Sequence, residues 1–388
     1  MTEMTPRERV AAAFEGRPCD KIPVHHIHAS SQVASALLGR EAYVGGGIQQ
    51  WREVSAWWQG EDAHTEFVER SFQDAIDLSR VLENDIIRPS YWRYNRKPTK
   101  RIDENTFLFE HGDESEWQVL RYDPPSEQCN LFPYRALQPV TFEDIERDVE
   151  AGEKSLGEYR PSESWFDFEF RTQKLLGDRY AIRIHGVGIS LPLADAGNEA
   201  WFEALILRPD LIARYLDLHV EHARHTIAFL AARGFKYLFG GGDFASNDGP
   251  MYSPRHFHEF LAPRLRQITD ICNQHGVYHL FASDGNLWPV ADDIFGYAGT
   301  HGFYEIDRRA GMDLRRLHDR FPHLTTVGNV SSHTLHLGTK DDVVRETMEA
   351  IAEGKRYSHT VVGVSNSIVP GTPIENLMAM LDAIREHR

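Results

Sequence analysis

Acidic and imidazole side chains stand at or just beyond the ends of several short apolar runs in this sequence. Carboxylates and imidazoles gathered in one place can exchange protons with a substrate, and their oxygen and nitrogen atoms can also bind a hard metal ion. The catalytic candidates are Asp243, Glu305, His185 and Asp284. The candidates for binding a metal are His185, Asp243, His279 and Glu305.

A second set of side chains at the same run ends has the chemistry to hold a substrate. Arg88 could clamp a carboxylate, and the flat rings of Tyr91, Trp92 and Trp288 could hold an aromatic or methylated compound. The full set of expected substrate contacts is His28, Arg88, Tyr91, Trp92, Ser283, Trp288, Asn329 and Asn366.

Each of the charged candidates also has a purely structural interpretation. Asp243 and Asp284 stand beside glycines and could form turns, and His185 could bind a loop carbonyl. Arg88 could pair with Glu83 or Asp85. His279 alternates with Phe281 and Ser283 and could be a packed core histidine that faces the barrel interior. Glu305 lies between Tyr304 and Ile306, where an acid requires a partner or a function.

The elements that would position these side chains follow from eight apolar runs with helical segments between several of them. The runs cover residues 22–28, 85–88, 180–185, 237–243, 277–284, 302–305, 324–329 and 360–366. Strands that end in polar residues are typical of an α/β TIM (β/α)8 barrel, whose active site lies at the carboxyl ends of its strands. We expect one domain over residues 1–388.

The regular alternation breaks for about 90 residues between the second and third runs. Residues 101–111 and 117–122 alternate in polarity across Gly112-Asp113, which predicts a β-hairpin. Because neither end has a flexible linker, we expect an insertion over roughly 93–177 rather than a separate domain.

Composition excludes several classes of function. The 388 residues are 41% hydrophobic and 26% charged, as in a globular protein with a sizeable core. A net charge of -16 argues against binding to nucleic acid, because few cations are available to displace phosphate counterions. No apolar run approaches the roughly 20 residues of a membrane span, and the first residues lack the core of a signal peptide, so a cytoplasmic protein without a membrane partner is expected.

Several motifs make the chain resemble the uroporphyrinogen decarboxylase superfamily, which also holds corrinoid-dependent methyltransferases. They are Met4-Thr-Pro-Arg-Glu-Arg-Val within residues 4–24, Gly240-Gly-Gly-Asp within 240–257, Ser283-Asp-Gly-Asn, Thr326-Val-Gly-Asn-Val-Ser and Ile368-Val-Pro-Gly-Thr-Pro-Ile-Glu-Asn. The resemblance implies a TIM barrel, and it indicates the methyltransferase-like branch rather than an authentic porphyrin decarboxylase. It also suggests a homo-oligomer.

The chain departs from both well-known site patterns of that superfamily. Where the porphyrin decarboxylases resemble one another in an arginine-rich loop after the first strand, this chain has His28-Ala-Ser-Ser-Gln-Val. Where the zinc methyltransferases carry His-x-Cys and a later Cys, it has Phe281-Ala-Ser283 and Asn366. The usual thiolate zinc site is therefore absent, although Glu305 matches an acidic ligand position of the methionine synthase branch.

These features lead to three hypotheses of different kinds. The first is a methyltransferase or demethylase that acts on a small methylated compound, with a corrinoid protein or cofactor as methyl acceptor. The second is a decarboxylase or lyase of a small, possibly aromatic carboxylate, in which Arg88 orients the carboxylate. The third is a barrel that binds a tetrapyrrole or corrinoid without turning it over.

Overall fold

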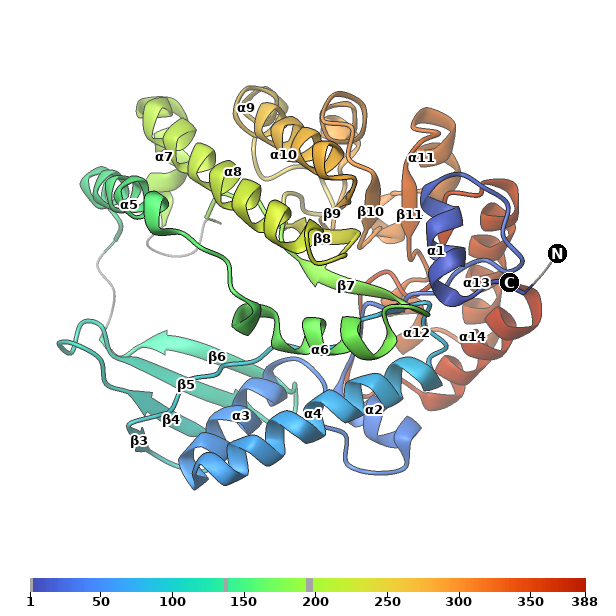
Figure 1. Cartoon of the computed structure of the whole chain (residues 1–388), viewed down its shortest axis with the longest axis horizontal. Coiled ribbons are helices and arrows are strands. Elements are labelled where there is room, and N and C mark those ends of the chain that lie inside the picture. The colour runs from blue at the N-terminus through green and yellow to red at the C-terminus, as the bar shows by residue number, and fades with distance from the viewer. Residues whose placement is uncertain (1–2, 136–138, 193–197) are drawn as a thin grey trace.

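A seven-stranded parallel sheet forms the centre of the computed structural model, which describes residues 3–135, 139–192 and 198–388 (Figure 1). In spatial order its strands are β12 (Thr360–Val361), β11 (Thr325–Val327), β10 (Gly302–Tyr304), β9 (Tyr278–Ala282), β8 (Tyr237–Gly241), β7 (Ala181–His185) and β2 (Ile86–Ile87). Each strand lies within one of the predicted apolar runs, so sequential runs are neighbours in the sheet.

The first predicted run, residues 22–28, joins the two edges of this sheet without forming a regular strand. The amide of His25 donates to Val362 O at 2.9 Å, and the amide of Asp85 donates to Val24 O at 2.8 Å. The amides of Val24 and His26 donate to the side chains of Asp85 and Asn84 instead of to strand carbonyls, and only an isolated bridge, Val24 to Val362, forms here. The expectation of a full strand over 22–28 was wrong.

Where this segment ends, the chain forms a separate two-stranded sheet. Strand β1 (His28–Ala29) pairs in parallel with β13 (Ser367–Ile368), so His28 lies opposite Ser367. This places the segment that follows the first run beside the one that follows the last.

Helices surround the sheet (Figure 1). They are α1 (Pro6–Phe14), α2 (Ser31–Leu38), α3 (Gly47–Gln59), α4 (Glu61–Val81), α5 (Phe142–Ser155), α6 (Asp167–Leu176), α7 (Glu199–Leu207), α8 (Pro209–Ala231), α9 (Pro254–His256), α10 (Ala262–His275), α11 (Leu314–Arg320), α12 (Ser332–Leu337), α13 (Lys340–Arg356) and α14 (Ile374–His387). Local capping fixes several of these starts: Thr5 and Glu8 form a capping box on α1, and Thr339 and Asp342 form one on α13.

Each of the two faces of the sheet is covered by its own apolar layer. Phe281, Phe303 and other residues of one face pack under the helices, whereas Phe239, Leu280 and Tyr304 belong to a smaller cluster on the opposite, enclosed face. Phe14 of α1 packs against Tyr237 and Tyr278 at the amino ends of the strands. Helix α1 therefore closes that end of the sheet.

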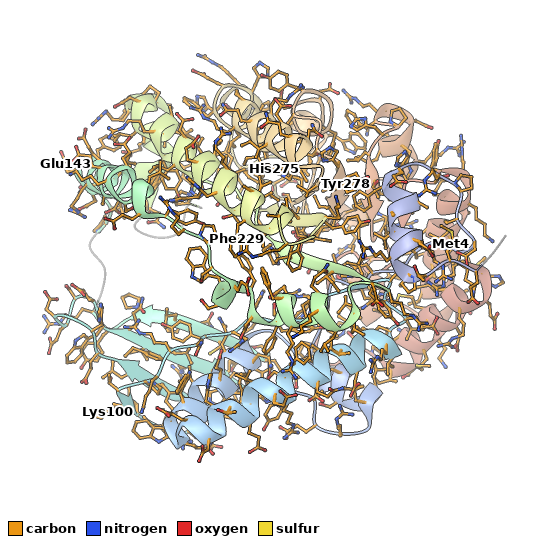
Figure 2. The ribbon with its side chains drawn as sticks, in the orientation of Figure 1. Met4, Lys100, Glu143, Phe229, His275 and Tyr278 are labelled. Carbon is orange, nitrogen blue, oxygen red and sulfur yellow. The ribbon has the colours of Figure 1, made fainter. Side chains whose placement is uncertain are left out.

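The segment between β2 and β7 contains a separate antiparallel sheet, beside α3 (Figure 1). Its strands are β3 (Lys100–Arg101), β4 (Thr106–Phe109), β5 (Gln118–Asp123) and β6 (Gln128–Pro133). Lys100 on β3 and Tyr278 on β9 mark the two sheets in Figure 2. Strands β4 and β5 coincide with the segments of the predicted hairpin, and β3 and β6 extend the pairing on either side.

Among the described residues, no helix is long and apolar enough to cross a membrane.

Candidate functional site

Strand alternation on β7 places Arg183 and His185 on the enclosed face of the sheet. Ala181, two residues before Arg183, belongs to the enclosed apolar cluster, whereas Ile182 and Ile184 pack under the helices. Arg183 is 4% exposed, and its guanidinium lies over the rings of Phe239 and Tyr304 at 4.6 and 5.0 Å. His185 follows at the strand end and reaches solvent.

Arg88 lies close to Arg183, at the end of β2. Its Nε donates to Ser90 O and its Nη1 to Ile27 O, both at 3.0 Å. Burial and the charge of Arg183 lower the pKa of Arg88 to about 10. The carboxylates considered as its partners lie elsewhere, because Asp85 pairs with Arg9 and Arg388, and Glu83 with Arg385 and Arg388.

The histidines around these two arginines are neutral. His25 donates from Nδ1 to Ile86 O at 2.9 Å and presents Nε2 to Arg183 Nη1 at 3.5 Å. Burial lowers the pKa of His28 to about 3, and both of its ring nitrogens lack a hydrogen-bond partner among the described residues. Although His185 is exposed on one side, the protein that encloses the rest of its ring, together with Arg183 and Arg88, lowers its pKa. None of the three offsets a positive charge, and none adds one.

A cavity of about 130 Å³ opens beside the two arginines. The wall contains Arg88, Arg183 and His185 together with Ser90, Tyr91, Trp92 and Glu169. Trp92 is half exposed and stacks on His28 with ring centroids 5.9 Å apart. A neighbouring hollow of about 330 Å³ shares Ser90, Tyr91, Glu169 and His185, so this region extends outward toward Trp165. Its size and aromatic walls suit a small molecule.

Glu305 joins this region through an unusual backbone conformation. Phe303 faces the helices and Tyr304 faces inward, so regular alternation would direct residue 305 away from the site. Its φ of 64° is in the left-handed region, which a non-glycine residue adopts at a cost in free energy and which occurs preferentially at functional sites. Burial raises the pKa of Glu305 to about 7, Arg183 and Arg88 oppose that increase, and Asp284 and Asp243 add to it. A carboxyl with this pKa can donate or accept a proton near neutral pH.

Asp284, Asp243 and Asn366 complete the acidic side of the site. Asn366 Nδ2 donates to Asp284 Oδ2 at 2.6 Å. Burial raises the pKa of Asp284 to about 6; the Asn366 hydrogen bond opposes this rise, and the charges of Asp243 and Asp307 favour it. Asp243 is exposed just beyond β8. Asp243, Asp284 and Glu305 are thus near enough for the charges of the two aspartates to act on Glu305, and Glu305 and His185 both respond to the charges of Arg183 and Arg88.

Two predicted residues on or beside β9 face away from the site. His279 is buried on the helix side of β9, where its Nδ1 is 2.9 Å from Thr269 Oγ1 of α10. It is packed as expected, but the expectation that it faces the barrel interior was wrong. Ser283 is fully buried; its hydroxyl accepts from the Phe244 amide and donates to Asp284 O. Alternation explains both positions, because residues 279, 281 and 283 share the outer face.

Two further predicted substrate contacts are used by neighbouring loops. Asn329 donates from Nδ2 to Met312 O at 3.4 Å and lines a different cavity, beside α13. Trp288 donates from Nε1 to Gly311 O at 2.8 Å and stacks under the guanidinium of Arg316. Both side chains bond to neighbouring loops, and neither lines the cavity beside Arg88 and Arg183.

The side chains that correspond to a thiolate zinc site do not fit a zinc ion. Ser283 is committed to the two backbone hydrogen bonds described above, and Asn366 is committed to Asp284 and to the Ser367 amide. In the described part of the chain, no three His, Cys, Asp or Glu side chains are grouped so that they could hold a metal ion. His185, Asp243, His279 and Glu305 therefore do not form one ligand set.

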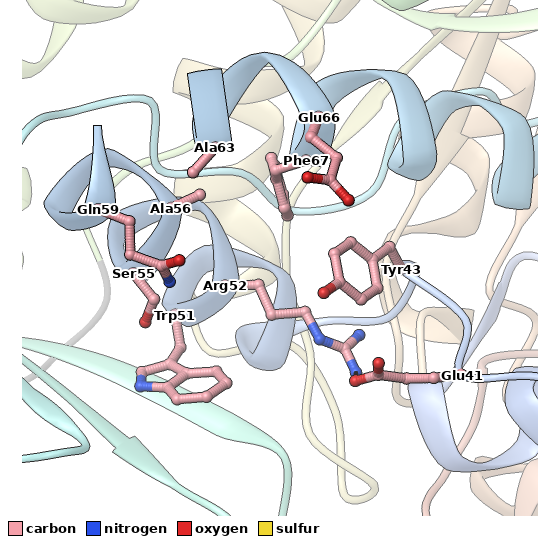
Figure 3. Close-up of a pocket in the computed structure, with 10 residues that line it drawn as sticks. All are labelled: Glu41, Tyr43, Trp51, Arg52, Ser55, Ala56, Gln59, Ala63, Glu66 and Phe67. Carbon is pink, nitrogen blue, oxygen red and sulfur yellow. Dashed lines mark hydrogen bonds and ion pairs between the residues drawn. The ribbon is translucent and has the colours of Figure 1, made fainter. Parts of the chain in front are cut away.

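A larger cavity, of about 350 Å³, lies between α3 and α4 and contains none of the predicted residues (Figure 3). Figure 3 shows Arg52 between Glu41 and Tyr43. Arg52 donates to Ser31 Oγ at 2.9 Å, to Ala42 O at 2.8 Å and to Glu41 Oε1 at 3.1 Å. The charge of Arg52 is therefore paired within the protein, although the buried Ser55 hydroxyl on the same wall has no hydrogen-bond partner among the described residues.

The residues that sequence reasoning missed at the site are Arg183, His25, Tyr304, Ser90 and Glu169. Arg183 had a usable signal, because it stands two residues before His185 in the same run and must share its face. Glu169 had none: it comes from α6, about 80 residues along the chain from Ser90, whose hydroxyl donates to its carboxylate. Burial raises the pKa of Glu169.

Comparisons with known proteins agree with this architecture. A structure described as a methyltransferase from Methanosarcina mazei superposes with a TM-score of 0.64 over 99% of this chain and 99% of its own, at 21% sequence identity, which establishes a shared fold. A uroporphyrinogen decarboxylase from Anaeromyxobacter sp. (strain Fw109-5) is 30% identical over 129 residues, which are 32% of this chain and 35% of that relative. The sequence model described as uroporphyrinogen decarboxylase (URO-D) matches residues 194–387, half of the chain. The chain belongs to the uroporphyrinogen decarboxylase family.

Proposed function

We propose that this protein is an enzyme of the methyltransferase-like branch of its family, which removes a methyl group from a small methylated compound. The observation that carries the proposal is Glu305, an acid held in a left-handed conformation, with a pKa raised to about 7 and within reach of the charges of Arg183 and Arg88. Loss of a methyl group from oxygen or nitrogen leaves a basic heteroatom. A protonated Glu305 can give that heteroatom its proton, which makes it a better leaving group. Likeness in fold to a methyltransferase over nearly the whole chain is consistent with this reaction.

The remaining polar groups would support the proton donor. Arg183 and Arg88 would orient the substrate, and the aromatic rings of Tyr91 and Trp92 would pack against it. Asp284, with a pKa raised to about 6 and fixed by Asn366, would act as the second proton carrier. His185 and Asp243 lie at the open side, where proton exchange with water is possible.

The acceptor in this proposal is a corrinoid, bound either as a cofactor or on a corrinoid protein, which supplies a nucleophile for the methyl group. Such a partner would approach the carboxyl ends of the strands. We also propose a homo-oligomer, and a closed (β/α)8 barrel in which residues 23–25 complete the eighth position and residues 93–177 form an insertion.

The test is a methyl-transfer assay with the full chain and reduced cobalamin, using a panel of small O- and N-methylated compounds. Formation of methylcobalamin with at least one donor, abolished in E305Q, is the expected result. Absence of methylcobalamin with every donor tested would contradict the proposal.

A second candidate is decarboxylation of a small carboxylate, favoured by the position of Arg88 beside Glu305. Here Arg88 would hold the carboxylate while Glu305 or Asp284 protonates the carbanion that remains after carbon dioxide leaves. Release of carbon dioxide from candidate acids, without methylcobalamin formation, would select this reaction over methyl transfer.

A further inference from the structure

Arg88 and Arg183 differ from the other arginines that are largely buried. Arg9, Arg52, Arg93 and Arg388 each have a carboxylate oxygen of this chain at 2.6–3.1 Å, from Asp20, Glu41, Glu53 and Asp85 respectively. Among the described residues, neither Arg88 nor Arg183 forms such an ion pair. Arg183 Nε has no hydrogen-bond partner at all in that part of the chain. Two adjacent buried cations without an anion cost free energy, unless a ligand supplies one.

The nearby groups of the described chain neutralise these guanidiniums only in part. The charge of Glu305 acts on both arginines, but its pKa is raised to about 7, so it is only partly ionised near neutral pH. His25 presents a neutral ring nitrogen to Arg183, and Tyr304 donates its hydroxyl to Gly240 O at 3.1 Å. Glu169, on the wall of the same cavity, accepts from Ser90 Oγ. Arg88 is held in place by two backbone carbonyls. The arrangement keeps both cations fixed at the cavity and leaves their charge available.

We infer that Arg183 and Arg88 form an anion site for a carboxylate carried by the substrate, and that an aromatic or other flat part of the same substrate lies against Tyr91 and Trp92. This inference deepens the proposed function, since it names the class of substrate that the site would take: a small methylated aromatic acid. A guanidinium presents two parallel N–H groups that match the two oxygens of a carboxylate.

The cavity favours a carboxylate over a phosphate group. Its volume of about 130 Å³ holds only a small group beside the rings. Glu169 stands on the same wall, and its carboxylate, when ionised, would repel a doubly charged phosphate more strongly than a singly charged carboxylate. The aromatic wall of Tyr91 and Trp92 matches a ring directly attached to the acid group.

The experiment measures binding of benzoate to the full chain by isothermal titration calorimetry, with benzamide and inorganic phosphate as matched probes. Benzamide keeps the ring and removes the charge, and phosphate keeps an anion and removes the ring. We expect benzoate to bind and benzamide to bind about tenfold or more weakly, because the charge-assisted hydrogen bonds are lost. R183M should weaken benzoate by a similar factor, and R183K, which keeps the charge, should weaken it less. R52M, in the cavity between α3 and α4, should leave benzoate binding unchanged.

Three outcomes would overturn the inference: no binding of benzoate by the wild-type chain, equal binding of benzoate by wild type and R183M, or tighter binding of phosphate than of benzoate. A W92A variant gives a second readout, because loss of the ring contact should reduce the preference for benzoate over acetate. Binding does not depend on turnover, so a chain that binds benzoate through Arg183 without methyl transfer would retain the anion site and reject the proposed reaction. Methyl transfer from a donor without a carboxylate, together with no benzoate binding, would support the proposed reaction and reject the anion site.

Discussion

The cavity between α3 and α4 and the cavity beside β2 and β7 are both lined by arginine, acidic and aromatic side chains, yet their charges are arranged differently. In the first, Arg52 is bonded to Glu41, Ser31 and Ala42. In the second, which is smaller, Arg183 has an unpaired Nε, and no carboxylate among the described residues pairs with it or with Arg88. Volume alone would select the first cavity. Unpaired charge, strained backbone at Glu305 and raised carboxyl pKa values select the second.

The largest expected effect concerns Glu305, whose pKa responds to the two arginines that line the second cavity. E305Q should lower kcat about 100- to 10,000-fold, because the amide keeps the shape of the side chain and cannot donate the proton. The matched control is E41Q at the first cavity, for which kcat should stay within about twofold. Both variants are compared in the methyl-transfer or carbon dioxide assay that identifies a substrate. If E305Q retained more than about a tenth of the wild-type kcat, Glu305 would not be the proton donor.

The next effect tests the difference between the two arginines directly. R52M should lower the free energy of unfolding by about 1–3 kcal/mol, because three hydrogen-bond acceptors lose their donor. R183M should leave the free energy of unfolding unchanged or increase it, because it removes a buried cation that forms no ion pair with a carboxylate among the described residues. Urea denaturation of the two variants beside wild type measures both changes. A larger loss in R183M than in R52M would mean that the charge of Arg183 is compensated within the folded chain.

A third prediction concerns pH. The pKa of Glu305 rises from its ordinary value of 4.5 to about 7 on folding, so its contribution to stability is fully present below about pH 4.5 and is lost as the pH rises through about 7. Wild type should therefore lose stability relative to E305Q between these two values, as measured by denaturation at a series of pH values. Turnover that uses the protonated form should likewise fall as the pH rises above about 7. Parallel stability curves for wild type and E305Q would contradict the raised pKa.

The smallest effect is expected outside both cavities. H279L should change kcat by less than about twofold, because His279 faces Thr269 of α10 and Thr269 keeps its hydrogen bond to Leu265 O. Elemental analysis of wild type and H279L accompanies the kinetics. Loss of activity together with loss of a bound metal would restore His279 as a ligand and would contradict its observed orientation.

The alternation of apolar runs predicted most of the central sheet, because the side chains of a buried parallel strand are constrained on both faces by packing. Seven runs contain the seven strands of that sheet. The first run failed as a regular strand because the amides of Val24 and His26 donate to the side chains of Asp85 and Asn84 instead of to strand carbonyls. The second sheet was foreseen only at β4 and β5, since β6 is largely exposed and β3 has just two residues, so neither has an apolar pattern to recognise.

The candidate site was predicted less evenly than the fold. Glu305 was selected for a sound reason, because an acid within an apolar segment is costly unless it has a role. The position of a polar residue at a strand end did not determine its direction, however, and Ser283, Asn329 and Trp288 are used by neighbouring loops instead.

The sequence by itself determined which segments are buried strands and which acids stand at their ends, since both depend on local pattern and hydrophobicity. Only the tertiary structure decided that Arg183 forms no ion pair with a carboxylate among the described residues, that Glu169 reaches Ser90 from α6, and that the left-handed backbone at Glu305 leaves its carboxyl within reach of the charges of Arg183 and Arg88. These properties depend on which groups from distant segments become neighbours when water is removed, because burial and nearby charge, rather than residue type, set the free energy of an ionised side chain.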